Sequence, residues 1–340
     1  MKIVVRAPNW IGDAVMSIPS IKSLKKNFSN DKIYIAADKW VAGIFEGVPY
    51  IEGILEFERG GRIKNIFSNA KYLKKFKFDL GLLFTNSFRT SLEFFIAGIS
   101  EIWGYRSDGR SLLLTKGIKK PKAPFSKHHV YYYMDLLTKL NLEVDEPKLE
   151  MYLSEEDLRR TEEIFKLKGA EENTLKIGIN PGAYYGKAKR WVTENYGILA
   201  NLLQKKFDSM IFIFGSKEEV PLSEEIAKSM DIKPVILAGE TSLRELISLI
   251  SRMDLFITND SGPMHIANAF RIPIIAIFGP TNPASTAPLH QPYKVIRKEL
   301  SCSPCKYREC PVDHLCMKEI SVWEVFKAAE ELLSQEKGIN

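Results

Sequence analysis

The feature that most constrains this chain is a repeated alternation of short apolar runs with helical stretches. Between the first two runs, MSIPSIKSLKKNF carries apolar residues at helical spacing. Strands that are apolar throughout and separated by helices are typical of parallel sheets covered on both faces. In the first half, the predicted strands are KIVVRA (2–7), KIYIAA (32–37), GILEF (53–57) and FDLGLLF (78–84).

The same alternation restarts at LKIGINPG (175–182) and continues with strands at 210–216, 234–239, 254–259 and 273–280. A length of 340 residues suits two domains at roughly 100–200 residues each. We therefore predict an α/β protein with an N-terminal domain over 1–155 and a C-terminal domain over 156–320. The amphipathic segment 321–340 has no strand after it, and we expect it to be a helix that packs at the domain junction.

Charge is unevenly distributed along the chain. Residues 1–150 carry 24 Lys and Arg against 16 Asp and Glu, a net of +8, whereas residues 151–340 carry 24 against 26, a net of −2. The basic runs at 71–77 and 116–127 are either a solvated face or a surface for an anionic partner such as a phosphate-bearing ligand, a membrane or a nucleic acid. The apolar stretches are shorter than the ~20 residues that span a bilayer. The N-terminus reads as a core strand and not as a signal peptide, so we expect a cytoplasmic protein.

Ligands of open parallel sheets bind at the carboxyl ends of strands, so the residues that follow each predicted strand are candidate site residues. After the first strand, RAPNWIGDAV places Asp13 at the predicted start of a helix. Asp13 is either a carboxylate that stabilises the helix N-terminus or a general base. Trp10 lies at the same strand mouth, where a large ring can cover a ligand. The G-x-G-x-x-G dinucleotide motif is absent from this turn.

The segment NPGAYYGKAKRW (180–191) follows the strand that opens the second domain. Gly182 permits a turn, and Lys189 brings a cation near its end. The spacing does not match the P-loop motif, because Gly182 and Gly186 are four residues apart and Lys187 precedes an alanine. ATP hydrolysis by a P-loop is therefore not expected.

The segment TNDSGPMHIANAF (258–270) lies between two apolar runs. Pro263 suits the first turn of a helix, with Ser261 or Gly262 as the N-cap. The free N–H groups of that helix would form an anion site, with Asp260 and His265 beside it. A nucleotide diphosphate is the ligand that this arrangement favours.

All four cysteines, Cys302, Cys305, Cys310 and Cys316, lie in the segment CSPCKYRECPVDHLC. Their spacing, C-x2-C-x4-C-x5-C, is compact enough for a structural zinc or an iron–sulfur site. Only one C-x2-C pair is present, where zinc ribbons usually have two. Reduced cysteines in a loop or a local disulfide are the alternatives, and any metal here would be structural.

The segments NWIGDAVMSIPSIKSLK, TNSFRTSLEFFIAGISEIWGYRSDGRSLLLT, NPGAYYGKAKRW, FGSKEE and TNDSGPMHIANAFRIPIIAIFGPTNP, in this order, resemble the ADP-heptose:lipopolysaccharide heptosyltransferases. The resemblance implies a GT-B fold, with two Rossmann-like domains whose parallel sheets face a central cleft. It also implies inverting transfer of L-glycero-D-manno-heptose from ADP-heptose to the inner-core heptose of lipopolysaccharide, with no cofactor required for catalysis.

The same resemblance assigns roles to individual residues. It makes Asp13 the catalytic base. The implied donor-binding residues are Lys189, Glu218, Asp260, Ser261, Gly262 and His265, and the implied acceptor-binding residues are Trp10, Asn86 and Arg89.

A lipid A–inner core acceptor would explain the basic first half, and it would bring the enzyme to the inner face of the cytoplasmic membrane as a peripheral protein. The alternative within enzymes is a related GT-B protein with another donor sugar, a heptosyltransferase I-like enzyme or a nucleotide-sugar epimerase. A nucleic-acid-binding module is disfavoured, because the basic runs are mostly lysine with aliphatic spacing and the polar clusters lie at strand ends. We therefore expect no nucleic-acid partner.

Overall fold

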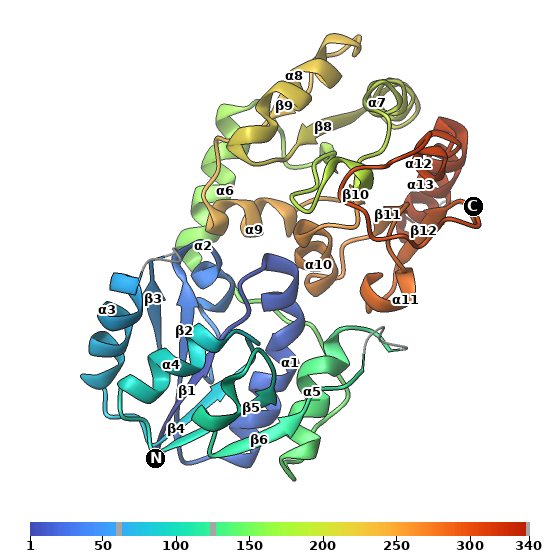
Figure 1. The fold of residues 1–340 in the computed structure, drawn as a ribbon. Coiled ribbons are helices and arrows are strands. Elements are labelled where there is room, and N and C mark those ends of the chain that lie inside the picture. Colours follow the sequence, from blue (N-terminus) through green and yellow to red (C-terminus); the bar gives the residue numbers. More distant parts are fainter. Residues whose placement is uncertain (59–62, 123–126, 338–340) are drawn as a thin grey trace. The chain divides into compact units, whose positions relative to one another are not determined.

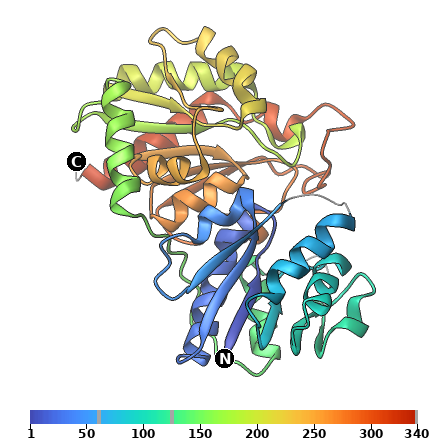
Figure 2. The ribbon, with the colours of Figure 1, turned by 90° about the vertical axis from the view of Figure 1, so that its left-hand side faces the viewer.

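The computed structural model describes residues 1–58, 63–122 and 127–337. The chain forms two compact units, Met1–Tyr152 (unit 1) and Leu153–Asn340 (unit 2), each shown in Figures 1 and 2. The boundary at 152/153 lies close to the predicted boundary at 155/156. Part of the basic run 116–127, residues 123–126, falls outside the described residues, as does the end of the predicted segment 321–340.

Unit 1 contains a six-stranded parallel sheet in the order β3-β2-β1-β4-β5-β6. Its strands are β1 (Lys2–Arg6), β2 (Lys32–Asp38), β3 (Gly53–Phe57), β4 (Leu80–Leu83), β5 (Glu101–Arg106) and β6 (Lys116–Lys119). Its helices are α1 (Ile11–Asn27), α2 (Lys39–Ala42), α3 (Ile63–Lys74), α4 (Phe88–Ile96) and α5 (Val130–Lys139), with 3₁₀ turns η1 (Gly43–Phe45) and η2 (Arg110–Leu113).

The central strand of unit 1 is β1, because Ile3, Val4 and Val5 are fully buried and pair on both sides. Arg6 at its end is in register with Leu83 at the end of β4. The strands are parallel, so the segments that follow β1 and β4 leave the same edge of the sheet side by side. This register places the segment containing Trp10 and Asp13 beside residues 84–87.

Unit 2 contains a second six-stranded parallel sheet in the order β12-β11-β10-β7-β8-β9. Its strands are β7 (Leu175–Asn180), β8 (Ser209–Ile213), β9 (Val235–Ile236), β10 (Leu255–Asn259), β11 (Ile274–Phe278) and β12 (Tyr293–Arg297). Its helices are α6 (Glu155–Leu167), α7 (Thr193–Phe207), α8 (Val220–Lys228), α9 (Leu243–Ile250), α10 (Gly262–Ala269), α11 (Pro283–Thr286), α12 (Leu315–Lys318) and α13 (Val322–Lys337), with 3₁₀ turns η3 (Lys187–Lys189) and η4 (Lys217–Glu219).

The register of unit 2 again brings two polar segments together. Thr258 near the end of β10 pairs with Asn180 at the end of β7. The segment 181–190 and the segment that begins at Asp260 therefore leave the same edge of the sheet from neighbouring strands. The structure thus confirms the two parallel sheets that the apolar runs predict.

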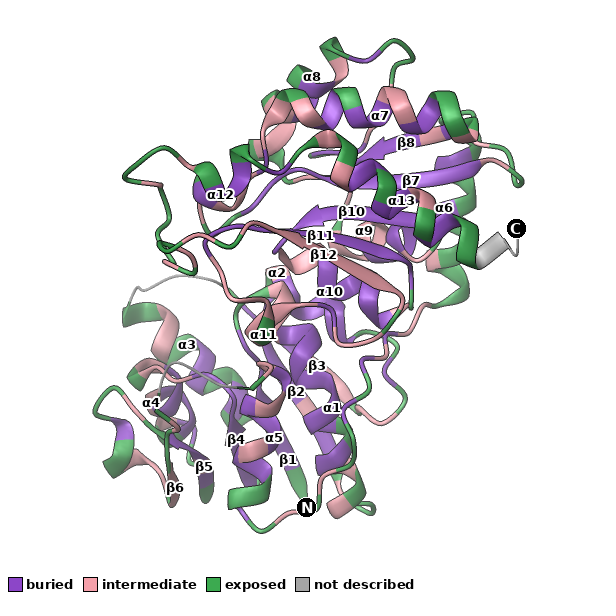
Figure 3. Ribbon diagram, turned by 90° about the vertical axis from the view of Figure 1, so that its right-hand side faces the viewer, coloured by how far each residue is buried: buried purple, intermediate pink, exposed green. Residues whose placement is uncertain are grey.

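The C-terminal helix α13 is part of the core of unit 2. Val325, Ala329 and Leu332 are buried in the same cluster as residues of α7 and of strands β7, β8, β10 and β11. Helix α13 contacts α7, β10, β11 and β12, and Figure 3 shows β10 and β11 as buried and β12 as intermediate. The apolar face of this helix therefore covers the sheet of unit 2, and its packing at the domain junction stays a prediction.

The sequence prediction missed several elements of the fold. Strands β5, β6 and β12 carry charged or partly exposed residues, so their apolar pattern is weak.

Among the described residues, no helix is both long enough and apolar enough to cross a membrane.

Candidate functional site

The carboxyl edge of the sheet in unit 1 contains a pocket of about 280 Å³, here called the Asp13 pocket. Segments that follow β1 and β4 form part of its wall, and the start of α5 and Lys120, which follows β6, form the rest. Its lining residues are Pro8, Asn9, Trp10, Asp13, Phe84, Thr85, Asn86, Ser87, Lys120, His129, Tyr132 and Tyr133. The structure therefore brings together three of the predicted site residues of this unit, Trp10, Asp13 and Asn86.

Asp13 lies in the first turn of α1, where the helix N-terminus favours a negative charge. Its Oδ1 lies 3.2 Å from Nε2 of His129. Burial raises the pKa of Tyr133 well above its usual range, and the nearby Asp13 carboxylate raises it further. The Tyr133 phenol therefore stays protonated and interacts with Asp13 as a donor. This carboxylate is partly exposed and faces a polar pocket, which suits a general base.

Asn86 is held in place by two hydrogen bonds from different elements. Tyr132 Oη donates to Asn86 Oδ1 at 2.8 Å, and Ser107 Oγ donates to the Asn86 carbonyl at 2.7 Å. Burial raises the pKa of Tyr132 to about 12, so its hydroxyl remains a donor at neutral pH. Since Oδ1 is engaged, the amide of Asn86 has a defined orientation at the pocket wall.

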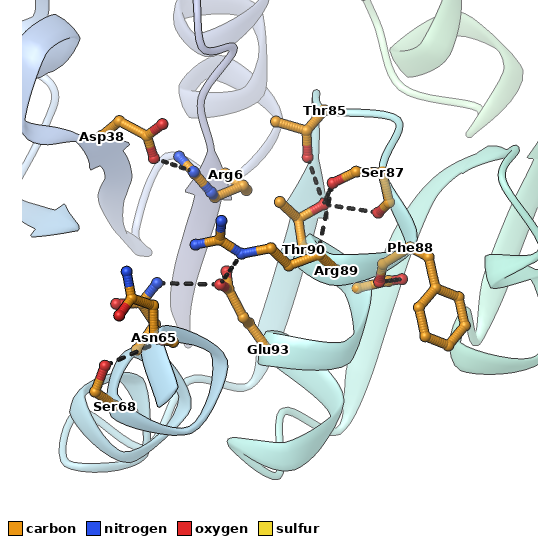
Figure 4. Close-up of polar contacts among 12 residues, drawn as sticks. Arg6, Asp38, Asn65, Ser68, Thr85, Ser87, Phe88, Arg89, Thr90 and Glu93 are labelled. Carbon is orange, nitrogen blue, oxygen red and sulfur yellow. Dashed lines mark hydrogen bonds and ion pairs between the residues drawn. The ribbon is translucent and has the colours of Figure 1, made fainter. Parts of the chain in front are cut away.

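Arg89 does not line the Asp13 pocket, although the sequence predicts that it binds the acceptor. Its Nε donates to Glu93 Oε1 at 2.9 Å, one turn along α4, and Asn69 Nδ2 donates to the same oxygen at 3.0 Å. Glu93 is fully buried, so Arg89 compensates a buried carboxylate, as Figure 4 shows. The geometry thus gives Arg89 a structural partner, and its acceptor role stays a prediction.

In unit 2, Lys189 and Asp260 form an ion pair at the carboxyl edge of the sheet. Lys189 Nζ lies 2.6 Å from Asp260 Oδ2 and donates to the Asp260 carbonyl at 3.2 Å. Thr281 Oγ1 donates to the same Oδ2 at 2.7 Å. The ammonium group also lies 5.1 Å from the centre of the Tyr185 ring. These contacts fix a cation on a loop at the place where the sequence predicts binding of the donor phosphates.

Helix α10 begins beside this ion pair. Ser261 is its N-cap and Pro263 lies in its first turn, as predicted, but no side chain caps the first turn. Ser261 Oγ instead contacts Thr258 Oγ1 at 3.0 Å and accepts from Asn180 Nδ2 at 3.3 Å. The backbone N–H groups that follow Gly262 are thus not used by a capping side chain, and an anion can accept from them.

His265 lies in the first turn of α10, and only 3% of it is exposed. Its proposed contact with the donor therefore stays a prediction.

Asn259 was not identified from the sequence, and it ties together the segments that follow β7 and β10. It is fully buried, donates to the Pro181 carbonyl at 2.7 Å and accepts from Tyr196 Oη at 3.0 Å.

Glu218 lines a separate pocket of about 340 Å³ in unit 2, here called the Glu218 pocket. Its lining residues are Ala183, Tyr184, Tyr185, Gly186, Lys187, Arg190, Ser216, Glu218, Glu219, Arg308 and Glu309. Neither Lys189 nor Asp260 is among them, but the loop that carries Lys189 forms one wall. The contact of Glu218 with the nucleotide ribose stays a prediction.

The cysteine-bearing segment 302–316, here called the cysteine loop, packs against the Lys189 loop. Ala188 N donates to the Arg308 carbonyl at 3.0 Å, and Tyr185 Oη donates to the Lys306 carbonyl at 2.9 Å. His314 Nε2 lies 2.7 Å from the Ala188 carbonyl oxygen. Gly186 permits this approach, since a Cβ there would lie 2.3 Å from the Arg308 carbonyl oxygen.

The four thiols of the cysteine loop are free. Burial, together with the other three cysteines, raises the pKa of Cys316 to about 11. Over the part of the chain that the structure describes, no three His, Cys, Asp or Glu side chains are arranged to hold a metal ion. The thiols therefore lie near one another without forming a metal-binding geometry or a disulfide.

Two parallel Rossmann-like sheets with polar clusters at their carboxyl edges define the GT-B class of glycosyltransferases. The family model described as glycosyltransferase family 9 (heptosyltransferase) matches residues 66–316. The chain belongs to this family, and is thus a glycosyltransferase.

Full-length relatives agree with this assignment. The chain is 30% identical to lipooligosaccharide heptosyltransferase 2 of Campylobacter jejuni over 98% of its own length and 99% of that protein. It is 31% identical to lipooligosaccharide heptosyltransferase 2 of Haemophilus influenzae over 87% of this chain and 88% of that one. The solved structure of ADP-heptose LPS heptosyltransferase II of E. coli matches with a TM-score of 0.85 and 28% identity, over 99% of this chain and all of that one.

Proposed function

We propose that this enzyme transfers L-glycero-D-manno-heptose from ADP-heptose to the inner-core heptose of lipopolysaccharide, with inversion at the anomeric carbon. The names of its full-length relatives support the donor and the acceptor class. The observation that carries the proposal is the pair of polar sites at the two sheet edges. One presents a carboxylate in a pocket, and the other presents a fixed cation beside an uncapped helix N-terminus.

In the proposed reaction, the Asp13 carboxylate accepts the proton of the acceptor hydroxyl. The hydroxyl oxygen then forms a bond to the anomeric carbon of the donor as the bond from that carbon to the phosphate oxygen of ADP breaks. The electron pair of the broken bond stays on the diphosphate. Displacement from the opposite face inverts the configuration, and a single base on the acceptor side is sufficient.

The departing ADP gains negative charge as the glycosidic bond breaks. Lys189 and the N–H groups at the start of α10 are placed to stabilise that charge, because they are fixed before the reaction starts. Asp260 holds Lys189, with Thr281 bound to the same carboxylate oxygen. Glu218, in the neighbouring pocket, is assigned to the nucleotide ribose. No cofactor is required in this scheme.

The acceptor is proposed to bind the Asp13 pocket, with Trp10 and Asn86 on its walls. We also propose that the enzyme is cytoplasmic and acts as a peripheral protein at the inner face of the cytoplasmic membrane, because its acceptor carries lipid A. The net charge of +8 over residues 1–150 supports attraction to an anionic surface. Sedimentation with vesicles that contain or lack anionic lipid, at low and high salt, tests this part separately.

Turnover of ADP-heptose with defined inner-core acceptors tests the reaction, with ADP release and the new linkage as readouts. We expect ADP release only in the presence of an acceptor that ends in the inner-core heptose. Release that is independent of acceptor would count against transfer. Conversion of ADP-heptose into another nucleotide sugar would indicate the epimerase alternative, and preference for another donor or for an acceptor without heptose would indicate a related transferase.

A further inference from the structure

His129, which the sequence motifs did not single out, contacts the Asp13 carboxylate from the start of α5. His129 is the N-cap residue of α5, and its Nε2 lies 3.2 Å from Asp13 Oδ1. Both side chains are 27% exposed, and both line the Asp13 pocket. Helices α1 and α5 pack against each other, so this contact joins two elements that form the same wall.

The imidazole ring of His129 is held by two aromatic neighbours. It stacks on Tyr132 with ring centres 5.3 Å apart and an interplanar angle of 6°, and it meets the edge of Tyr133 at 5.7 Å and 89°. Tyr132 is itself fixed, because its hydroxyl donates to Asn86 Oδ1. Two perpendicular ring contacts leave the imidazole little freedom to rotate, so the direction of Nε2 toward Asp13 is defined by packing.

A carboxylate that takes a proton from a bound hydroxyl must present one oxygen to it in a fixed direction. The isolated Asp13 side chain could rotate and exchange its two oxygens. We propose that His129 is a positioning residue, which binds Oδ1 of Asp13 through Nε2–H and so holds the carboxylate in one orientation toward the acceptor hydroxyl. This inference rests on the proposed function, because it takes Asp13 as the base.

The expected loss of kcat in a His129 variant depends on how precisely the Asp13 carboxylate is positioned. Misplacement of a reacting group by about 1 Å can cost roughly 10²-fold in rate. We therefore expect His129→Phe to lower kcat by about ten- to a hundredfold, while the KM for ADP-heptose changes less than about twofold. The phenyl ring keeps the contacts with Tyr132 and Tyr133 but has no N–H group.

The conservative variant separates positioning from packing. His129→Gln places an amide N–H near the position of Nε2, so it should recover most of the activity that His129→Phe loses. Both variants should unfold within about 2–4 °C of the wild type. His128→Asn is the matched control, since His128 Nδ1 accepts from Val130 N at 3.2 Å and its side chain does not line the pocket.

A spectroscopic measurement tests the contact without relying on turnover. The ¹⁵N chemical shift of His129 Nε2, recorded on full-length protein, should change in Asp13→Asn and stay unchanged in Asp260→Asn. Equal shifts in wild type and Asp13→Asn would overturn the inference. So would a His129→Phe enzyme with wild-type kcat, or a His129→Gln enzyme as impaired as His129→Phe.

A double-mutant comparison separates this inference from the proposed function. If His129 acts through Asp13, His129→Phe should cost nothing more in an Asp13→Ala background. An added loss of tenfold or more would make His129 an independent catalytic group and overturn the positioning role. Asp13→Ala with wild-type turnover would instead refute Asp13 as the base, and the chemical-shift result would still report whether the two side chains pair.

Discussion

Lys189 and Asp260 form a close ion pair across two neighbouring loops of unit 2, with Nζ 2.6 Å from Oδ2. The side chains are 13% and 6% exposed, so neither charge is well solvated. The sequence predicts both residues at the donor diphosphate, but it does not predict that one holds the other. Asp260 therefore sets the position of the Lys189 ammonium group, and Thr281 contacts the same carboxylate. A bound diphosphate would share Lys189 with Asp260.

Lys189→Met should lower kcat for transfer by about 10²–10³-fold, the usual cost of removing one preorganised charge-stabilising group. The affinity for ADP should fall as well, because the lost cation serves both the bound and the leaving diphosphate. Steady-state kinetics and calorimetric titration with ADP measure the two effects. Lys205→Met, an exposed lysine in the last turn of α7, is the control. Unchanged kcat in Lys189→Met would contradict the assignment.

Asp13→Ala should retain ADP binding and lose most transfer, since a general base contributes about 10²–10⁴-fold and does not touch the nucleotide. ADP affinity measured by calorimetry and turnover measured by ADP release give the two values on the same protein. Wild-type turnover in this variant would remove Asp13 from the mechanism. A parallel loss of ADP affinity would point to a folding defect, which thermal unfolding identifies.

His314→Ala should raise the KM for ADP-heptose while kcat at saturating donor changes little. His314 Nε2 lies 2.7 Å from the carbonyl oxygen of Ala188, the residue before Lys189. Removing the imidazole therefore loosens the Lys189 loop before the donor binds. Val312→Ala removes an exposed side chain from the same loop and serves as the control. An equal effect of both substitutions on KM would show that the loop as a whole, and not this contact, is responsible.

Chelation of divalent metal ions should leave turnover unchanged, because Lys189 and the start of α10 supply the positive charge that the leaving diphosphate needs. The measurement is ADP release in buffer with EDTA and after addition of Mg²⁺. Activity that disappears with EDTA and returns with Mg²⁺ would contradict the scheme. Metal analysis of protein purified without added zinc tests separately whether the four cysteines hold a structural metal or are reduced thiols.

Asp38→Ala should destabilise the protein by about 3–5 kcal/mol, the cost of leaving a buried charge without its partner. Asp38 pairs with Arg6 at the end of β1, as Figure 4 shows. Arg6 is only 2% exposed. Urea unfolding followed by circular dichroism measures the loss. Asp31→Ala, on a partly exposed carboxylate, should cost much less. Equal costs would indicate that the Arg6–Asp38 pair does not contribute as a buried interaction.

The sequence by itself determined the two sheets and the start of α10. Apolar, β-branched runs such as residues 3–5 are typical of strands in a sheet covered on both faces, and Pro263 suits a first helical turn without any tertiary context. These features depend on the local sequence pattern, so the sequence predicts them without knowledge of the tertiary structure. The pair of Arg89 and Glu93 also has a local signal, the i,i+4 spacing on a helix, which the acceptor assignment overlooked.

Only the tertiary structure decided which polar groups meet. His129 reaches Asp13 because α5 packs on α1, and His314 reaches the Lys189 loop because the cysteine loop folds back across it. The position of α13 in the core of unit 2 has the same origin, since an amphipathic pattern shows that one face is buried but not against what. Contacts between residues far apart in the chain depend on packing of complementary surfaces, and a hydrophobic period carries no information about the partner surface.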